Sequence, residues 1–133
     1  MDIYLYEYII RGIILKRIVV AGSRNYENYD EAKEYIRSCL SQQDDGDVLI
    51  FVSGGCKGAD MLGERYAKEF GYPIERYPAQ WEQFGKAAGV KRNKKMAEIS
   101  DFVICFWDGE SRGTKSLIVC AEKLGKPVHI KYI

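Results

Sequence analysis

Two hydrophobic patterns take turns along this chain, and together they predict strands separated by helices. Continuous apolar runs bounded by turn residues are typical of strands that are covered on both faces. Between them, apolar side chains recur at helical spacing. The five expected strands are residues 17–21, 48–52, 74–77, 102–107 and 128–133. The four expected helices are residues 31–42, 58–70, 87–99 and 114–124, and Asp30 can cap the first of them.

Strands that alternate with helices in this way predict a parallel sheet with right-handed crossovers. We therefore expect one three-layer, Rossmann-like α/β domain with a mainly parallel five-stranded sheet over residues 17–133. The 133-residue length fits a single domain of this kind. Residues 1–16 are rich in β-forming side chains and form an N-terminal extension. The sequence leaves open whether this extension adds a strand, makes an oligomer contact or reflects a start codon assigned too early.

The amino-acid composition argues against several classes of function. The net charge of +1 gives no overall basic field for nucleic acid, although the basic run at residues 91–95 keeps a local contact open. The four cysteines form no C-x-x-C pair and there is one histidine, so we expect neither a metal site nor a cofactor. No segment is apolar over the length of a bilayer and no secretory signal is convincing. We expect a cytoplasmic protein without a membrane partner.

The chemistry is expected around a glycine-rich turn, Ser53-Gly54-Gly55-Cys56-Lys57-Gly58-Ala59-Asp60. It follows an apolar strand and opens a helix. Glycines let a ligand approach the backbone, and a helix start offers unpaired N–H groups to an anion. The motif matches neither the dinucleotide fingerprint nor the P-loop. The alternatives are a tight turn without a ligand, or a catalytic thiol at Cys56 that lacks a histidine base.

Two further turns follow strand ends, namely Gly22-Ser23-Arg24 and Ser111-Arg112-Gly113-Thr114. In parallel sheets, ligands bind outside the carboxyl ends of the strands, where the strand order reverses. Arg24 and Arg112 are suited to clamping a phosphate. A carboxylate at Asp60 would repel phosphate, so we expect ribose near Asp60 and phosphate near Ser111–Thr114. Trp81 and Trp107 are candidate stacking surfaces for a base, with ordinary packing as the alternative.

Five motifs occur in a fixed order. They are Gly22-Ser23-Arg24, Ser53-Gly54-Gly55-x-x-Gly58-Ala59-Asp60, Trp81-x-x-Phe84-Gly85-Lys86-Ala87-Ala88-Gly89, Arg92-Asn93-x-x-Met96 and Asp108-Gly109-x-Ser111-Arg112-Gly113-Thr114. This order closely resembles the YspA/YpsA-related branch of the SLOG (SMF/DprA-LOG) superfamily of bacteria and their phages. The resemblance covers about residues 17–133. It implies a Rossmann-like domain that binds nucleotides or nucleotide-derived ligands, and a homodimer by analogy with relatives that pair across a helix face.

Relatives in the superfamily include the Lonely Guy phosphoribohydrolases, DNA-processing proteins that bind single strands, and sensor domains. Arg92-Asn93-Lys94-Lys95-Met96 looks like the R-K-x-x-M motif of the hydrolases, and residues 108–114 look like their P-G-G-x-G-T motif. The glutamate expected three residues after Thr114 is Leu117. Cleavage of an N-glycosidic bond needs a carboxylate. Arg92, Asp60 and Glu110 are therefore the candidate catalytic residues of an enzyme, with Arg92 orienting phosphate.

We predict that the chain binds a nucleotide or nucleotide-derived small molecule, for sensing or sequestration. The first alternative is a phosphoribohydrolase-like enzyme, and the second is a protein that binds single-stranded nucleic acid through residues 91–95. The expected ligand-binding residues are Gly22, Ser23, Arg24, Ser53, Gly54, Gly55, Gly58, Asp60, Trp81, Arg92, Asn93, Asp108, Ser111, Arg112, Gly113 and Thr114.

Overall fold

Five parallel strands form one sheet in the computed structural model, which describes residues 12, 14–43 and 46–133. The strands are β1 (Leu15–Gly22), β2 (Val48–Ser53), β3 (Ile74–Arg76), β4 (Phe102–Trp107) and β5 (Val128–Tyr132). Their order across the sheet is β3-β2-β1-β4-β5, and every neighbouring pair is parallel. The expected five-stranded parallel sheet is confirmed. Most of the N-terminal extension, residues 1–11 and 13, lies outside the described ranges, so an extra strand there is not tested. The expected boundary at residue 17 is corrected, because Leu15 and Lys16 already belong to β1.

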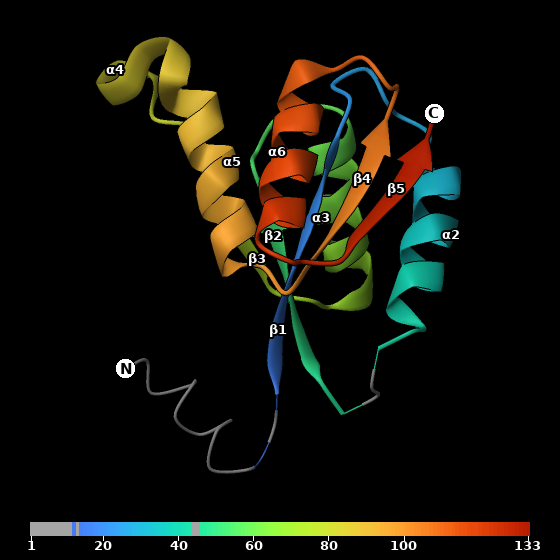
Figure 1. Cartoon of the computed structure of the whole chain (residues 1–133). Helices are drawn as coiled ribbons and strands as arrows, with labels where there is room; N and C mark the ends of the chain where they lie inside the picture. Colours follow the sequence, from blue (N-terminus) through green and yellow to red (C-terminus); the bar gives the residue numbers. More distant parts are fainter. Residues whose placement is uncertain (1–11, 13, 44–45) are drawn as a thin grey trace.

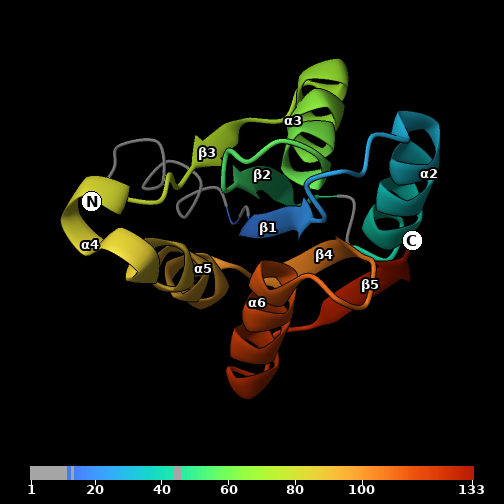
Figure 2. The same ribbon diagram turned by 90° about the horizontal axis from the view of Figure 1, so that it is seen from above.

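Helices cover both faces of the sheet, which makes the expected three layers (Figure 1). They are α2 (Tyr29–Leu40), α3 (Ala59–Phe70), α4 (Trp81–Phe84), α5 (Ala88–Ile99) and α6 (Arg112–Lys123), with a 3₁₀ turn, η1 (Gly85–Ala87), between α4 and α5. Figure 2 shows α2 and α3 on one face and α5 and α6 on the other. Figure 1 shows α4 standing out from the body of the molecule above α5. None of the described helices is long and apolar enough to cross a membrane.

Helix ends follow local signals, with one correction to the prediction. We expected Asp30 to cap α2, but the side chain of Asn28 accepts a hydrogen bond from the N–H of Glu31 at 3.2 Å. Because Asn28 is the cap, the helix begins at Tyr29 and Asp30 lies in its first turn, where a carboxylate favours the helix dipole. Helix α3 ends at Gly71, whose left-handed φ of 77° is the usual glycine stop.

The core has two halves, one on each side of the sheet, because successive side chains of a strand point to opposite faces. Ile18, Val20, Phe51, Ile104 and Phe106 pack toward α2 and α3, while Val19, Val52, Val103, Cys105 and Leu117 pack on the side of α5 and α6. Full burial of one such aliphatic side chain contributes about 1.5–3 kcal/mol. Burial also raises the pKa of Cys105 to about 12, so this thiol stays protonated and acts as a core residue.

The strand order places a topological switch point between β1 and β4. From β1 the chain proceeds to β2 and β3 on one side, and from β4 it proceeds to β5 on the other. The loops that leave the carboxyl ends of β1 and β4 therefore diverge and leave space between them, which is where ligands bind in open parallel sheets.

Candidate functional site

A cavity of about 330 Å³ opens at this switch point, above the carboxyl ends of β1 and β4. It collects most of the side chains that the sequence motifs had suggested. The expected residues that line it are Gly22, Ser23, Arg24, Asp60, Arg92, Asn93, Asp108, Ser111, Gly113 and Thr114. They come from the ends of β1 and β4, from the first turns of α3 and α6 and from the second turn of α5, so the fold brings together motifs that lie far apart in the sequence.

The end of β1 runs against β4 without room for a side chain. A Cβ on Gly22 would lie 2.1 Å from the carbonyl oxygen of Phe106. The next residue, Ser23, donates its backbone N–H to the same oxygen at 2.9 Å. Its side chain is buried and close enough to Asp108 to help lower the pKa of that carboxyl, although no hydrogen bond of ordinary geometry joins its Oγ to the described residues. A buried hydroxyl without a partner is uncommon, and this one lines the cavity.

Three N–H groups of the glycine-rich turn after β2, those of Gly55, Cys56 and Ala59, are bonded within the protein. The N–H of Ala59 donates to the carbonyl oxygen of Ser23 at 3.2 Å, and the N–H of Gly55 donates to Oγ of Ser53 at 3.1 Å. Gly58, with a φ of +83°, lies against the backbone of Ser23 and Arg24. The turn therefore joins the start of α3 to the end of β1, and its main effect on the cavity is to position Asp60.

Asp60 is a buried carboxyl group, with 5% of its surface exposed, at the wall of the cavity. Burial raises the pKa of Asp60 to about 6, against the opposing effects of the Cys56 N–H and the positive charge of Arg92. The N–H of Cys56 donates to its Oδ2 at 3.2 Å. At neutral pH this group carries a poorly solvated negative charge, so a ligand that donates hydrogen bonds or carries positive charge would suit it.

Arg92 lies close to Asp60 across Gly54, and contacts with three residues fix its guanidinium. Its Nη1 donates to the carbonyl oxygen of Gly54 at 2.6 Å, and its Nε donates to Oδ1 of Asn93 at 2.9 Å. Its Nη2 lies 3.8 Å from the sulfur of Cys56. Asn93 in turn donates from Nδ2 to the carbonyl oxygen of Gly113 at 3.1 Å and so links α5 to α6. Asn93 is thus engaged with protein partners through both ends of its amide.

The start of α6 presents an open anion-binding geometry. Ser111 precedes the helix without a side-chain cap, and its Oγ lies 3.3 Å from Oγ1 of Thr114. Within the described part of the chain, the backbone N–H groups of Arg112, Gly113 and Thr114 have no acceptor. These groups and the helix dipole favour a negative charge at this end.

Asp108 begins the loop that leads to α6. Its Oδ1 accepts the N–H groups of Glu110 and Ser111, each at 2.8 Å. The bonds from Ser111 and Glu110 lower the pKa of Asp108, so it is ionised at neutral pH. On the same loop, Nε1 of Trp107 donates to the carbonyl oxygen of Ser111 at 3.1 Å. Trp107 therefore holds the loop in place rather than offering an open stacking face.

The floor of the cavity is apolar, formed by Ala21, Met96 and Leu117. Leu117 is 1% exposed and occupies the position where the hydrolase motif has its glutamate. These three residues were not predicted as part of the site, because apolar residues at helix and strand positions have the same sequence pattern as ordinary core residues. Asn25 was also missed, although it directly follows the Gly22-Ser23-Arg24 turn.

Several predicted residues lie elsewhere. Gly54, Gly55 and Trp81 line a neighbouring hollow of about 520 Å³. The two hollows share Arg24, Cys56 and Arg92. Four predicted residues line neither hollow, namely Ser53, Gly58, Glu110 and Arg112. Ser53 donates from Oγ to the buried Glu64 at 2.7 Å and therefore has a structural partner. No metal-binding group of three or more side chains gathers among the residues described.

Known proteins resemble this chain in sequence and in fold. The model of the YspA, cpYpsA-related SLOG family matches residues 16–84. The chain belongs to this family. It is also 32% identical over 120 residues to the Gene 61 protein of Mycobacterium phage D29, and the match covers 86% of this chain and 94% of the phage protein. The family expected from the order of the motifs is thereby confirmed.

Solved structures share the fold of this SLOG protein at lower identity. TM1055, a structural genomics target, superposes with a TM-score of 0.60 at 22% identity and covers 85% of this chain and 72% of its own. DNA processing protein A (DprA) of Streptococcus pneumoniae superposes with a TM-score of 0.67 at 20% identity, over 88% of this chain. This SLOG domain spans half the length of DprA. At these identities the likeness concerns the Rossmann-like fold.

Proposed function

We propose that this SLOG protein binds a nucleotide or a nucleotide-derived small molecule in the cavity between β1 and β4. The observation that carries the proposal is the pairing of two opposite environments within one cavity of about 330 Å³. The start of α6 offers N–H groups and two hydroxyls to an anion, and Asp60 offers a buried acceptor. A nucleotide carries both complements, a phosphate and a ribose with hydroxyl donors.

The phosphate would lie at the start of α6, on the N–H groups of residues 112–114 and the hydroxyls of Ser111 and Thr114. Arg24 is exposed at the rim of this cavity and would add a charge-assisted bond. The unpartnered Oγ of Ser23 is a further donor that a ligand would satisfy. The ribose would face Asp60, because a carboxylate accepts from hydroxyl groups and repels phosphate. The base would extend toward Trp81, which is 53% exposed in the neighbouring hollow.

A second candidate function is cleavage of the N-glycosidic bond of the bound nucleotide. One observation favours it, namely the carboxyl group of Asp60, because a pKa of about 6 suits general acid or base catalysis. The cavity floor opposes it, because the buried Leu117 stands where the hydrolase motif has a glutamate, and Glu110 lies outside the cavity. Binding without turnover therefore has the stronger support.

The test is a thermal-shift screen against the four common nucleoside 5′-monophosphates and ADP-ribose, followed by titration calorimetry of the best ligand. The variant Ser111→Ala removes one hydroxyl from the expected phosphate site, and Ser116→Ala removes one hydroxyl from the same helix outside the cavity. We expect Ser111→Ala to weaken binding about tenfold, the usual effect of losing one bond to a charged group, and Ser116→Ala to leave it unchanged.

Mass spectrometry of the same incubations separates the two functions. Recovery of intact ligand supports binding, and appearance of the free base establishes the hydrolase. No shift with any of these nucleotides, or equal weakening by both serine variants, would overturn the proposed site.

A further inference from the structure

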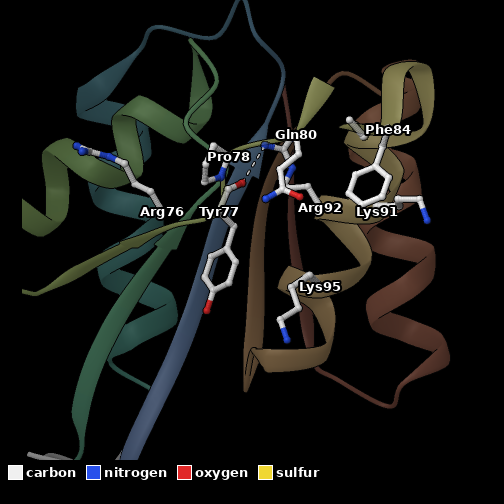
Figure 3. A pocket seen from close by; sticks show the side chains of 9 residues that line it. Arg76, Tyr77, Pro78, Gln80, Phe84, Lys91, Arg92 and Lys95 are labelled. Carbon is white, nitrogen blue, oxygen red and sulfur yellow. Dashed lines mark hydrogen bonds between the residues drawn. The ribbon is translucent and has the colours of Figure 1, made fainter. Parts of the chain in front are cut away.

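A third hollow, of about 270 Å³, lies beside the first two and shares Arg92 with both of them. Figure 3 shows the side chains that line it. It is formed by the segment after β3 and by one face of α5. Its chemistry is carried by Tyr77, Gln80, Phe84, Lys91, Arg92 and Lys95. Neither the proposed phosphate site nor the proposed ribose site uses this space.

The hollow carries positive charge without a matching carboxylate. Lys91 and Lys95 are one helical turn apart on α5, and both are exposed. Neither takes part in an ion pair within the described ranges, whereas Lys16, Arg17, Lys33 and Arg76 each do. The ammonium group of Lys91 lies 4.8 Å from the centre of the Phe84 ring, which holds it at the rim.

Arg76 also lines the hollow, but its positive charge is paired with Glu64 and is not available to a ligand. Its Nε donates to Oε1 of Glu64 at 3.0 Å, and Figure 3 shows its side chain directed away from Lys91, Arg92 and Lys95. The net positive charge available to a ligand therefore comes from Lys91 and Lys95, with Arg92 between this hollow and the nucleotide cavity.

The three hollows adjoin one another at Arg92, because it lines all three of them. Its guanidinium is anchored to the carbonyl of Gly54 and reaches toward the carbonyl of Tyr77 at 3.5 Å. A ligand that passes over Arg92 therefore goes directly from the ribose position to the lysines without leaving the protein surface.

Two carboxylates interrupt the positively charged surface where it enters the nucleotide cavity. Asp60 and Asp108 both line the cavity, so the basic groups fall into two separate places, the start of α6 with Arg24, and Lys91 with Lys95. A long polyanion would meet both carboxylates. A ligand with two phosphates separated by a ribose would place the ribose at Asp60 and a phosphate at each basic place.

We propose that the hollow at Lys91 and Lys95 is a second phosphate subsite, and that the ligand is a nucleotide with a phosphate on both its 5′ and 3′ sides. Nucleoside 3′,5′-bisphosphates and 5′-phosphorylated dinucleotides share this chemistry. The 5′-phosphate occupies the start of α6, and the 3′-phosphate crosses Arg92 to the lysines. This inference rests on the proposed nucleotide site.

The test is titration calorimetry of the full chain with three adenine probes and their guanine counterparts. The probes are adenosine 5′-monophosphate, adenosine 3′,5′-bisphosphate and 5′-phosphorylated diadenylate. We compare the native protein with Lys91→Ala/Lys95→Ala and with Lys94→Ala/Lys123→Ala, which loses the same charge from exposed positions outside the hollow.

The 3′-phosphate is expected to raise affinity about tenfold or more over the monophosphate, as a pair of charge-assisted contacts would. Lys91→Ala/Lys95→Ala should remove this gain and leave the monophosphate affinity unchanged, and the control variant should keep the gain. The bisphosphate and the dinucleotide differ by one nucleoside, so their relative affinities identify which of the two the subsite prefers.

Three results would overturn the inference. Equal affinity for the monophosphate and the bisphosphate would remove the second subsite while leaving the nucleotide site intact. Loss of the gain in affinity in the control variant Lys94→Ala/Lys123→Ala would show that the gain comes from the overall positive charge of the protein and not from the subsite. Affinity that continues to rise in a further series of longer 5′-phosphorylated oligoadenylates would establish a single-strand binder instead. Failure of every monophosphate to bind would instead refute the proposed function itself.

Discussion

The Nη1 atom of Arg92 lies 2.6 Å from the carbonyl oxygen of Gly54, so a side chain of α5 is tied to the loop that follows β2. Gly54 is suited to this contact, because a Cβ at this position would lie 2.6 Å from the same Nη1 and 2.9 Å from Oδ2 of Asp60. Arg92 and Asp60 therefore approach each other over a residue without a side chain. This contact defines the boundary between the three hollows.

Replacing Arg92 with Gln should weaken nucleotide binding by about tenfold to a hundredfold, the effect of losing a charge-assisted bond. Arg92→Lys should restore only part of the affinity, because one ammonium group cannot bond to Gly54 and extend toward the ligand in the planar geometry of a guanidinium. Lys94→Gln, which removes one charge from the same helix, is the matched control. Calorimetry measures the affinity of all three variants. Equal losses of affinity for Arg92→Gln and Lys94→Gln would contradict a specific contact between Arg92 and the nucleotide.

Asp60 should make the ligand-free protein less stable as the pH rises from 5 to 7. Its folded-state pKa of about 6 is higher than the ordinary value of 3.8, so the folded state binds the proton more tightly than the unfolded state. The stabilisation is complete below the unfolded-state pKa and is lost as the pH rises through the folded-state pKa. The expected loss is about 1 kcal/mol over this range.

The variant Asp60→Asn should lack this particular pH dependence, and urea unfolding at pH 5, 6 and 7 measures the difference. Asp101→Asn is a matched control, because Asp101 is exposed at the opposite end of β4. A native protein whose pH dependence between 5 and 7 equals that of Asp60→Asn would show that Asp60 titrates normally.

Gly58→Ala should destabilise the fold by about 2 kcal/mol or more. The residue has a φ of +83°, which costs an L-residue about 1–2 kcal/mol, and its new Cβ would lie 2.4 Å from the carbonyl oxygen of Ser23. Gly113→Ala is a control that should not lose stability, because no atom lies within 4 Å of its Cβ position and alanine is the better helix former. Thermal unfolding should therefore show a marked drop in Tm for the first variant and none for the second.

Arg76→Ala should cost about 1–3 kcal/mol of stability, because it leaves the buried Glu64 with one partner fewer. Glu64 is 3% exposed, and although burial alone would raise its pKa, the bonds from Arg76 and Ser53 lower it below the ordinary value. Lys33→Ala breaks a pair whose carboxylate, Glu69, is 40% exposed, and should therefore cost less stability than Arg76→Ala. Chemical denaturation that gives equal losses for the two variants would contradict a special role for Arg76.

The strands were predictable because fully covered parallel strands are uninterrupted apolar runs. The expected bounds of β4 match the structure, and those of β1 and β2 differ by one or two residues. Helix α4 was not predictable, because four residues before Gly85 are too few to show a helical period. The cap of α2 was assigned to Asp30 instead of Asn28, since both side chains are good caps and the sequence does not reveal which one lies at the helix start.

The lining of the cavity was predictable where a turn has an unusual composition. It was not predictable where a side chain has a structural partner or is also part of the hydrophobic core. Gly22, Ser23, Arg24 and the Ser111–Thr114 turn were recognisable because glycine and hydroxyl residues follow apolar runs. Ser53 belongs to the same kind of turn, but its hydroxyl binds Glu64, eleven residues further along. Leu117 and Met96 carry the ordinary signal of a buried helix face, so only the folded chain shows that they also form the floor of the cavity.

The joint between β1 and α3, in which the N–H of Ala59 binds the carbonyl oxygen of Ser23, consists of main-chain atoms alone. Mutation of neighbouring side chains leaves such a bond in place as long as Gly58 is retained. Arg24, Asn25 and Lys57, the exposed residues around this joint, are therefore open to replacement at small cost in stability. In the proposed function these rim residues help to select the ligand, so members of the family can exchange them while inheriting the same frame, and divergence in ligand preference should be fastest at these positions.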